Sequence, residues 1–271
     1  MDSYPPPVNK LLALGDIREE LKQPDYLALG LRPEHVPDLI RMATDKELLW
    51  ADSEDDEVWA PIHAWRALGQ LRAVEAIEPL MGLFEPLLEE GDDWIFEEMP
   101  AAFGNIGPAA IPALKSYLAD TARDESARVC ALVCLEEIVK KHPEARDECV
   151  AIFMHQLEQL EQDAGYLNGS LVSALLDLKA VEAAPVMELA FKANCVDEWI
   201  AGDWDDVQVE LGLKERSEIP PQLELEPEPE PFPLMPPFFE RPAPYSGHAS
   251  QKKKARRQQE KKSRKINSKR R

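Results

Sequence analysis

Motifs of catalysis are missing from this chain of 271 residues. It has no glycine-rich phosphate loop, no GxSxG elbow, no HExxH pair and no set of protein-kinase motifs. The five histidines are scattered, and for His63 a packed structural role is the better prediction. Catalysis needs a nucleophile or a base held beside a partner group. We therefore predict that the protein is not an enzyme and carries no cofactor.

Cysteine is also scarce, with four residues and no CxxC pair. This number is too low for a disulfide-stapled secreted scaffold, so reduced thiols are expected. Cys130 and Cys134 are four residues apart and would share one face of a helix, where they could in principle share a metal. No second pair follows at ligand spacing. We predict two small core residues and no metal site.

Long apolar runs are absent too. No segment approaches the roughly 20 apolar residues that a membrane span needs. The first residues, MDSYPPP, lack the charged and apolar regions of a signal peptide. The expectation is a soluble cytoplasmic protein that does not contact a membrane.

Charge is abundant and unevenly distributed. The chain has 31 basic and 51 acidic residues, a net charge of −20. Residues 252–271 contain twelve Lys or Arg and one Glu, a net of +11, which leaves 19 − 50 = −31 on residues 1–251. The sequence therefore combines an acidic body with a basic tail.

The body contains the same helix-turn-helix pattern written twice between residues 58 and 118. Gly69 and Gly104 are 35 residues apart, and Ile77 and Ile111 are 34 residues apart. Such a period is typical of stacked helical repeats. We predict an all-α solenoid in which both glycines close the first helix of a pair in a left-handed backbone conformation.

Related patterns extend the array to about five helix pairs between residues 8 and 194. The second helices are expected at residues 33–42, 74–80, 108–114, 144–161 and 181–187. Residues 195–213 should close the array, because the last repeat must cover its apolar face. Trp199 and Trp204 are the large aromatics expected in this cap.

These repeats resemble the HEAT-like repeat, including the short form found in phycobilisome lyases. Residues 8–213 also resemble a bacterial group of uncharacterised HEAT-like proteins, DUF1186. The resemblance implies a helical-repeat fold and brings no catalytic residue with it. A short cysteine-rich metal-binding motif often follows the repeats in that group, and this sequence lacks it. Metal-dependent binding is therefore not carried over.

Composition changes sharply after the repeats. Ten of the 28 residues from 217 to 244 are proline, which excludes a helix or a central strand. We predict a HEAT-like solenoid over residues 1–213, a disordered linker rich in proline and glutamate over 214–247, and a basic tail over 248–271.

Acidic clusters precede three of the predicted first helices, at residues 52–57, 89–93 and 120–125. Stacking of the repeats should bring these clusters to one edge. One interpretation is that carboxylates favour helix N-termini and keep loops solvated. The other is that the edge attracts a cationic partner, including the tail itself, with Asp55, Asp56, Asp92 and Asp93 as candidate binding residues.

The tail has no aromatic residue, so it cannot stack on bases and would contact phosphates without regard to sequence. A solubilising or targeting tail would have the same composition. Its candidate binding residues are Lys252, Lys253, Lys254, Arg256, Arg257, Lys261, Lys262, Arg264 and Lys265.

The sequence favours a noncatalytic scaffold or adaptor. Its helical array would bind a protein partner, and its basic tail would bind an anionic partner such as RNA or the ribosome. The alternative is an accessory lyase or chaperone-like factor of the phycobilisome-lyase type, which the HEAT-like resemblance implies. Such a factor would handle a tetrapyrrole together with a second subunit.

Overall fold

The computed structural model describes residues 4–17, 24–51, 55–92 and 94–216. These ranges are all-helical and contain no strand, so the predicted all-α class is confirmed. Their α-helices are α1 (Val36–Ala43), α2 (Lys46–Leu49), α3 (Ala60–Gln70), α4 (Ile77–Met81), α5 (Phe84–Glu89), α6 (Trp94–Ile106), α7 (Ile111–Ala119), α8 (Glu125–Lys141), α9 (Arg146–Leu157), α10 (Gly165–Asp177), α11 (Ala184–Lys192), α12 (Glu198–Ala201) and α13 (Trp204–Glu210). Their 3₁₀ helices are η1 (Val8–Ala13), η2 (Pro33–His35), η3 (Asp56–Trp59), η4 (Val74–Ala76), η5 (Pro108–Ala110), η6 (Pro143–Ala145) and η7 (Val181–Ala183).

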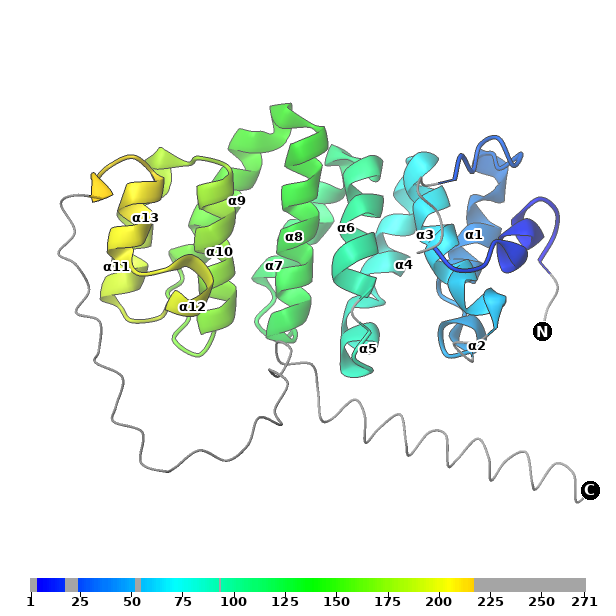
Figure 1. Cartoon of the computed structure of the whole chain (residues 1–271), viewed down its shortest axis with the longest axis horizontal. Helices are drawn as coiled ribbons and strands as arrows, with labels where there is room; N and C mark the ends of the chain where they lie inside the picture. Colours follow the sequence, from blue (N-terminus) through cyan, green and yellow to red (C-terminus); the bar gives the residue numbers. More distant parts are fainter. Residues whose placement is uncertain (1–3, 18–23, 52–54, 93, 217–271) are drawn as a thin grey trace, which may run out of the picture. The chain divides into compact units, whose positions relative to one another are not determined.

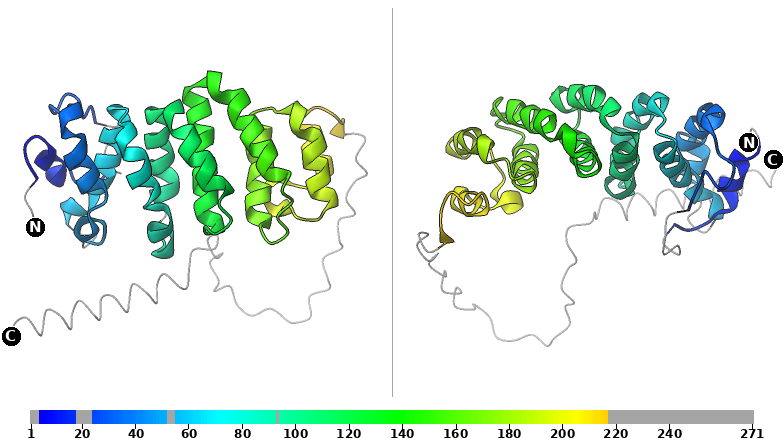
Figure 2. Two further views of the ribbon diagram at one scale, coloured as in Figure 1. Left: turned by 180° about the vertical axis from the view of Figure 1, so that it is seen from behind. Right: turned by 90° about the horizontal axis from the view of Figure 1, so that it is seen from above.

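Successive helices pack side by side in the order of the chain, from the blue helices at the right of Figure 1 to the yellow ones at the left. Two layers can be followed from their contacts, and two rows are visible from above in Figure 2. The first layer contains η1, α3, α6, α8, α10 and α12, each in contact with the next. The second layer contains α1, α4, α7, α9, α11 and α13, again in sequence. The short helices α2 and α5 lie in the connections.

Each of the five predicted second helices begins in the same way. A three-residue 3₁₀ turn, one of η2, η4, η5, η6 and η7, runs directly into α1, α4, α7, α9 or α11. Pro37, Pro112 and Pro185 lie in the first turns of three of these helices. Proline fits there because the N–H groups of a first turn have no intrahelical partner. This shared start is the structural counterpart of the sequence repeat.

The predicted role of Gly69 and Gly104 is wrong. Both glycines lie inside helices, in α3 and α6, and neither has a positive φ. A methyl group on Gly69 would lie 3.1 Å from the Cα atom of Ala102 in α6. One on Gly104 would lie 2.8 Å from Cγ and 3.0 Å from the carbonyl oxygen of Glu137 in α8. These glycines therefore allow neighbouring first-layer helices to approach closely.

The left-handed residue that ends these helices comes three positions later. It is Arg72 (φ 52°) after α3 and Gly107 (φ 89°) after α6. At Arg72 the backbone N–H donates to the carbonyl of Gly69 at 2.9 Å, and the next N–H, of Ala73, donates to Leu68 at 3.0 Å. This pair of bonds satisfies carbonyls that a helix end leaves open. The helices thus end three residues beyond Gly69 and Gly104, at a non-glycine residue in the first case and at a glycine in the second.

His63 and the cysteines belong to the interior. The His63 ring is fully buried, its Nδ1 lies 2.7 Å from the Tyr26 hydroxyl, and its Nε2 lies 3.0 Å from the carbonyl oxygen of Gly15. Cys130 and Cys134 are buried in α8, and burial raises the pKa of the Cys134 thiol well above its usual value. The predicted packed histidine and core cysteines are confirmed.

The end of the array is closed by α13. Val207 is fully buried there, and the Trp204 ring lies 5.8 Å from the ring of Phe191 in α11. The N-terminus of α13 is capped by Asp203, whose carboxylate accepts a bond from the Asp206 N–H at 2.9 Å. Trp204 is thus the tryptophan that covers the last repeat. Trp199 takes no part in this cover.

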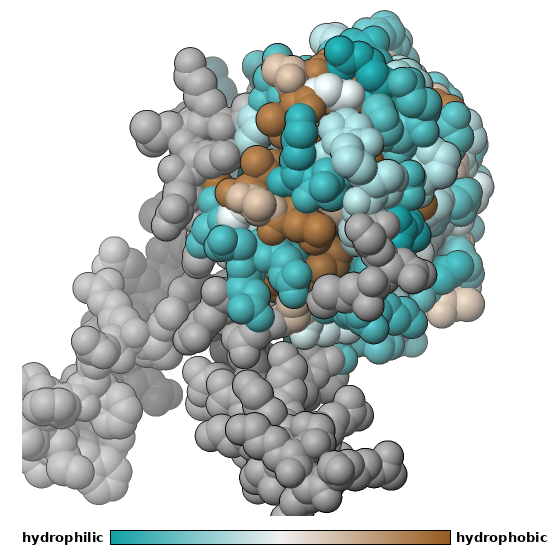
Figure 3. All heavy atoms as spheres, turned by 90° about the vertical axis from the view of Figure 1, so that its right-hand side faces the viewer, coloured by the Kyte–Doolittle hydropathy of each residue, from teal (hydrophilic) through white to brown (hydrophobic). Residues whose placement is uncertain are grey.

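None of the helices in the described part of the chain combines the length and apolar character needed to cross a membrane. Figure 3 shows the end of the helix stack where the chain begins, and apolar residues gather there among hydrophilic ones.

Candidate interaction surface

The starts of the first-layer helices lie along one edge of the helix stack. The rings of Trp59 and Trp94, which precede α3 and begin α6, are 5.6 Å apart. Beyond them, the carboxylate of Glu85 in α5 accepts a bond from the Asp124 N–H at 3.2 Å, just before α8. These contacts bring the starts of α3 and α6 together and place the segment before α8 beside α5.

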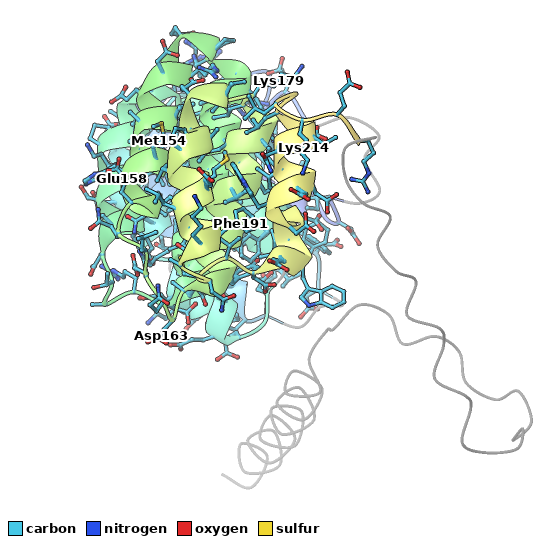
Figure 4. All side chains as sticks on the ribbon, turned by 90° about the vertical axis from the view of Figure 1, so that its left-hand side faces the viewer. Met154, Glu158, Asp163, Lys179, Phe191 and Lys214 are labelled. Carbon is cyan, nitrogen blue, oxygen red and sulfur yellow. The ribbon has the colours of Figure 1, made fainter. Side chains whose placement is uncertain are left out.

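The same edge continues to the end of the array. The Glu125 carboxylate at the start of α8 accepts a bond from the Leu167 N–H at the start of α10, at 2.9 Å. The Asp197 N–H, just before α12, donates to the carbonyl of Gly165 at 3.0 Å. Figure 4 shows the direction of α10, with Asp163 before the helix at the lower end and Lys179 after it at the upper end. We call the lower side the acidic edge, made of residues 55–59, 92, 94, 120–125, 163–166 and 197–199.

Several of its carboxylates cap helices. Asp92 accepts a hydrogen bond from the Trp94 N–H at 3.0 Å, and Asp124 accepts bonds from Ser126 and Ala127 at 2.9 and 3.3 Å. Asp197 accepts a bond from the Trp199 N–H at 3.0 Å. Capping of this kind stabilises a helix by about 1 kcal/mol and accounts for acidic residues at these positions.

The predicted binding residues are only partly covered by the structure. Asp55 and Asp56 are exposed at η3, and Asp92 is half-buried at the start of α6. The stacked Trp59 and Trp94 rings bring these two acidic segments to the same part of the edge. Asp93 lies outside the described residues, as do the nine basic candidates of the tail from Lys252 to Lys265.

Two aromatic side chains, which the sequence did not suggest as binding residues, lie exposed at the end of the acidic edge. Trp199 in α12 is 98% exposed, and Tyr166 in α10 is 43% exposed. Their segments are joined by the Asp197 to Gly165 hydrogen bond. Tryptophan and tyrosine are the residues most enriched at the centres of protein interfaces. The sequence signal was the DEWIAGDW segment, but it did not show which tryptophan is covered.

The segments around Trp199 and Tyr166 are rich in carboxylates. Partial burial raises the pKa of the Tyr166 hydroxyl, and the nearby Glu125 carboxylate raises it further. Residues 193–213 contain six Asp or Glu and no Lys or Arg. Two of these carboxylates are paired, Asp205 with Lys214 at 2.8 Å and Asp206 with Arg216. A cation approaching Trp199 would therefore be attracted by the surface it meets.

Two buried ion pairs outside the acidic edge hold parts of the fold together. Arg66 and Glu98 form a two-bond pair between α3 and α6 at 2.7 Å for both bonds. Arg128 forms a similar pair with Glu161 at 2.8 and 2.7 Å. Within the described ranges, no group of three or more His, Cys, Asp or Glu is arranged to hold a metal ion.

The described residues thus define an all-helical protein of repeated helix pairs, whose candidate site is an open acidic and aromatic surface. The chain belongs to the family described as "Protein of unknown function (DUF1186)", whose model matches residues 33–223. The expected DUF1186 relationship is confirmed. Neither the curated proteins nor the solved structures gave a match.

Proposed function

We propose that this protein is a noncatalytic scaffold that binds a protein partner through the acidic edge. The observation that carries the proposal is the 98% exposure of Trp199 on a helix whose backbone is hydrogen-bonded into the fold. Tryptophan is enriched at the centres of protein interfaces, so an exposed tryptophan on a fixed helix is a candidate contact for a partner. The scaffold would supply a fixed surface and leave chemistry to its partners.

The proposal includes a HEAT-like α-solenoid as the architecture of the scaffold. Two observations support it: the five second-layer helices that share a 3₁₀ start, and the ordered contacts within each layer. Arrays of this kind bind proteins over extended surfaces because each repeat adds area without adding a separate core.

A second partner class follows from charge alone. The basic tail would bind an anionic partner such as RNA or the ribosome through its twelve Lys and Arg, with contacts to phosphates and without sequence specificity. The acidic edge would repel the same polyanion, so the two ends of the chain would serve different partners.

The competing function is that of an accessory lyase or chaperone-like factor. Such a factor would bind a tetrapyrrole, and addition of bilins to the purified protein would then change their absorption spectrum. An unchanged spectrum is the result expected for the scaffold.

Affinity capture from cells tests the scaffold function. The full chain should recover a partner that survives nuclease treatment, and Trp199→Ala should reduce its recovery about fivefold or more. The reason is that truncation of a central aromatic commonly costs more than about 1 kcal/mol of binding free energy. Partners lost on nuclease treatment belong to the tail and its polyanion.

Two controls separate binding from folding. Trp199→Ala should leave the free energy of unfolding within about 0.5 kcal/mol of the original, because the side chain is exposed. Leu189→Ala removes another exposed apolar side chain, 57% exposed on α11 in the second layer, and should not change the recovery. Equal recovery by all three proteins would contradict a binding role for the acidic edge.

A further inference from the structure

Trp199 is held on a rigid base. Asp197 caps its backbone N–H at 3.0 Å, and the Asp197 N–H is bonded to Gly165 of α10 at 3.0 Å. On the inner side of α12, Ile200 lies so close to Gly169 that a methyl group there would come within 3.0 Å of the Ile200 Cδ1 atom. The short helix α12 is therefore fixed against α10. A partner would lose little free energy in ordering this surface on binding.

Carboxylates in the two segments that the Asp197–Gly165 bond joins give this surface its charge. Glu198 precedes it in α12 and Asp163 precedes α10, and both are exposed without an ion pair to any described residue. Glu125 joins the start of α8 to the same region through its bond to Leu167. An aromatic face among unpaired carboxylates suits a planar cation, which can stack on the ring and bond to carboxylate oxygens together.

Arginine fits this description better than other groups. Its guanidinium is planar, stacks on aromatic rings and binds carboxylates through two parallel bonds, whereas the lysine ammonium is a strongly hydrated point charge. Phosphates of a nucleic acid would be repelled by the same carboxylates. A second copy placed with this surface against itself would oppose acid to acid, since a two-fold interface contacts the same patch on both subunits.

We propose that the surface formed by Trp199, Tyr166 and the carboxylates of Glu198 and Asp163 binds an arginine-rich segment of a partner protein. This inference rests on the scaffold function and names the chemistry of its partner. Arginine side chains stack on the indole of Trp199, and the neighbouring carboxylates accept hydrogen bonds from their guanidinium groups.

Titration of the full chain with a fluorescent nonaarginine peptide at 0.15 M salt tests the proposal, with nonalysine as the comparison. Nonaarginine should bind more tightly than nonalysine. Trp199→Ala should weaken nonaarginine binding about two- to fivefold, as expected for loss of an exposed cation–π contact. Glu198→Gln should also weaken it, and Leu189→Ala should not. The indole N–H resonance of Trp199, assigned with Trp199→Phe, should shift on addition of the peptide.

Other occupants would give different results, and each would overturn the proposal. A Trp199 resonance that shifts with protein concentration alone would assign the surface to a second copy of the chain. A shift on removal of residues 252–271, without peptide, would assign it to the chain's own basic segment. Equal binding of nonaarginine and nonalysine, unchanged in Trp199→Ala, would leave only general charge attraction. Captured partners that depend on Trp199 while nonaarginine fails to bind would preserve the scaffold function and reject the arginine assignment.

Discussion

Replacing Arg128 with methionine should lower the free energy of unfolding by about 3 kcal/mol, the lower end of the range for breaking a buried ion pair. The Arg128 side chain is 3% exposed and that of Glu161 is 21% exposed. Arg128 also donates to the carbonyl of Leu118 at 2.7 Å. Its loss therefore leaves that acceptor without this donor, and leaves the Glu161 carboxylate with the Gln156 amide at 2.6 Å but no cation. Urea unfolding monitored by circular dichroism measures the change.

Arg146 provides a matched control. It too bridges a carboxylate and a helix-end carbonyl, with Glu182 at 3.0 Å and Leu178 at 3.0 Å. Its ion pair is much more exposed, and exposed pairs contribute about 0–1 kcal/mol. Arg146→Met should therefore change stability far less. Equal losses in the two variants would mean that the Arg128 pair has no special role in the interior.

The Arg128 effect should also depend on pH in a defined direction. Hydrogen bonds from Arg128 lower the pKa of the Glu161 carboxyl. The contribution of this pair to stability is therefore complete above the ordinary carboxyl pKa of about 4.3 and is lost as the pH falls through the lower, folded value. The stability difference between the original protein and Arg128→Met should shrink below about pH 4. A difference that grows in acid would contradict the assigned ion pair.

Gly104→Val should lower the free energy of unfolding by about 1–3 kcal/mol, the usual cost of overpacking a close contact. Even the first added carbon would lie 2.8 Å from the Glu137 side chain and 3.0 Å from its backbone oxygen. The modest gain in helix propensity over glycine cannot offset separation of α6 from α8. Thermal and urea unfolding would both report the loss.

Gly82→Ala is the control for this packing effect. Gly82 ends α4 with an ordinary helical φ of −63°, and an added methyl would come no closer than 3.4 Å to another atom. The substitution should be neutral or slightly stabilising, because alanine restricts the unfolded chain. If Gly104→Val unfolds at the same urea concentration as the original protein, close contact between α6 and α8 is not what requires glycine there.

The spacing of apolar residues, together with the positions of glycine and proline, was enough to predict the helical class and the approximate start of each second-layer helix. These patterns marked Gly69 and Gly104 as left-handed helix ends, whereas both lie inside helices that pack closely against a neighbour. A glycine near a helix end suggests a left-handed turn, but the same residue also serves close packing against a neighbour that the sequence does not identify. Arg72 adopts the left-handed conformation without any sequence signal of it.

The sequence also did not predict which side chains far apart in the chain would contact each other. Arg128 and Glu161 are 33 residues apart, and helix periodicity indicates a buried face without saying which charge meets which. Trp199 and Trp204 looked alike as candidates for the end cap. Only the placement of α12 on α10 and of α13 on α11 separates the exposed ring from the packed one.

Hydrogen exchange on the full chain, free and bound to its captured partner, tests the binding role of the acidic edge most directly. Exchange on binding should slow at residues 165–169 and 197–201, where the exposed aromatics and their supporting helix starts lie. Protection confined to the second-layer helices α7, α9 and α11, with no change at these residues, would contradict that binding role.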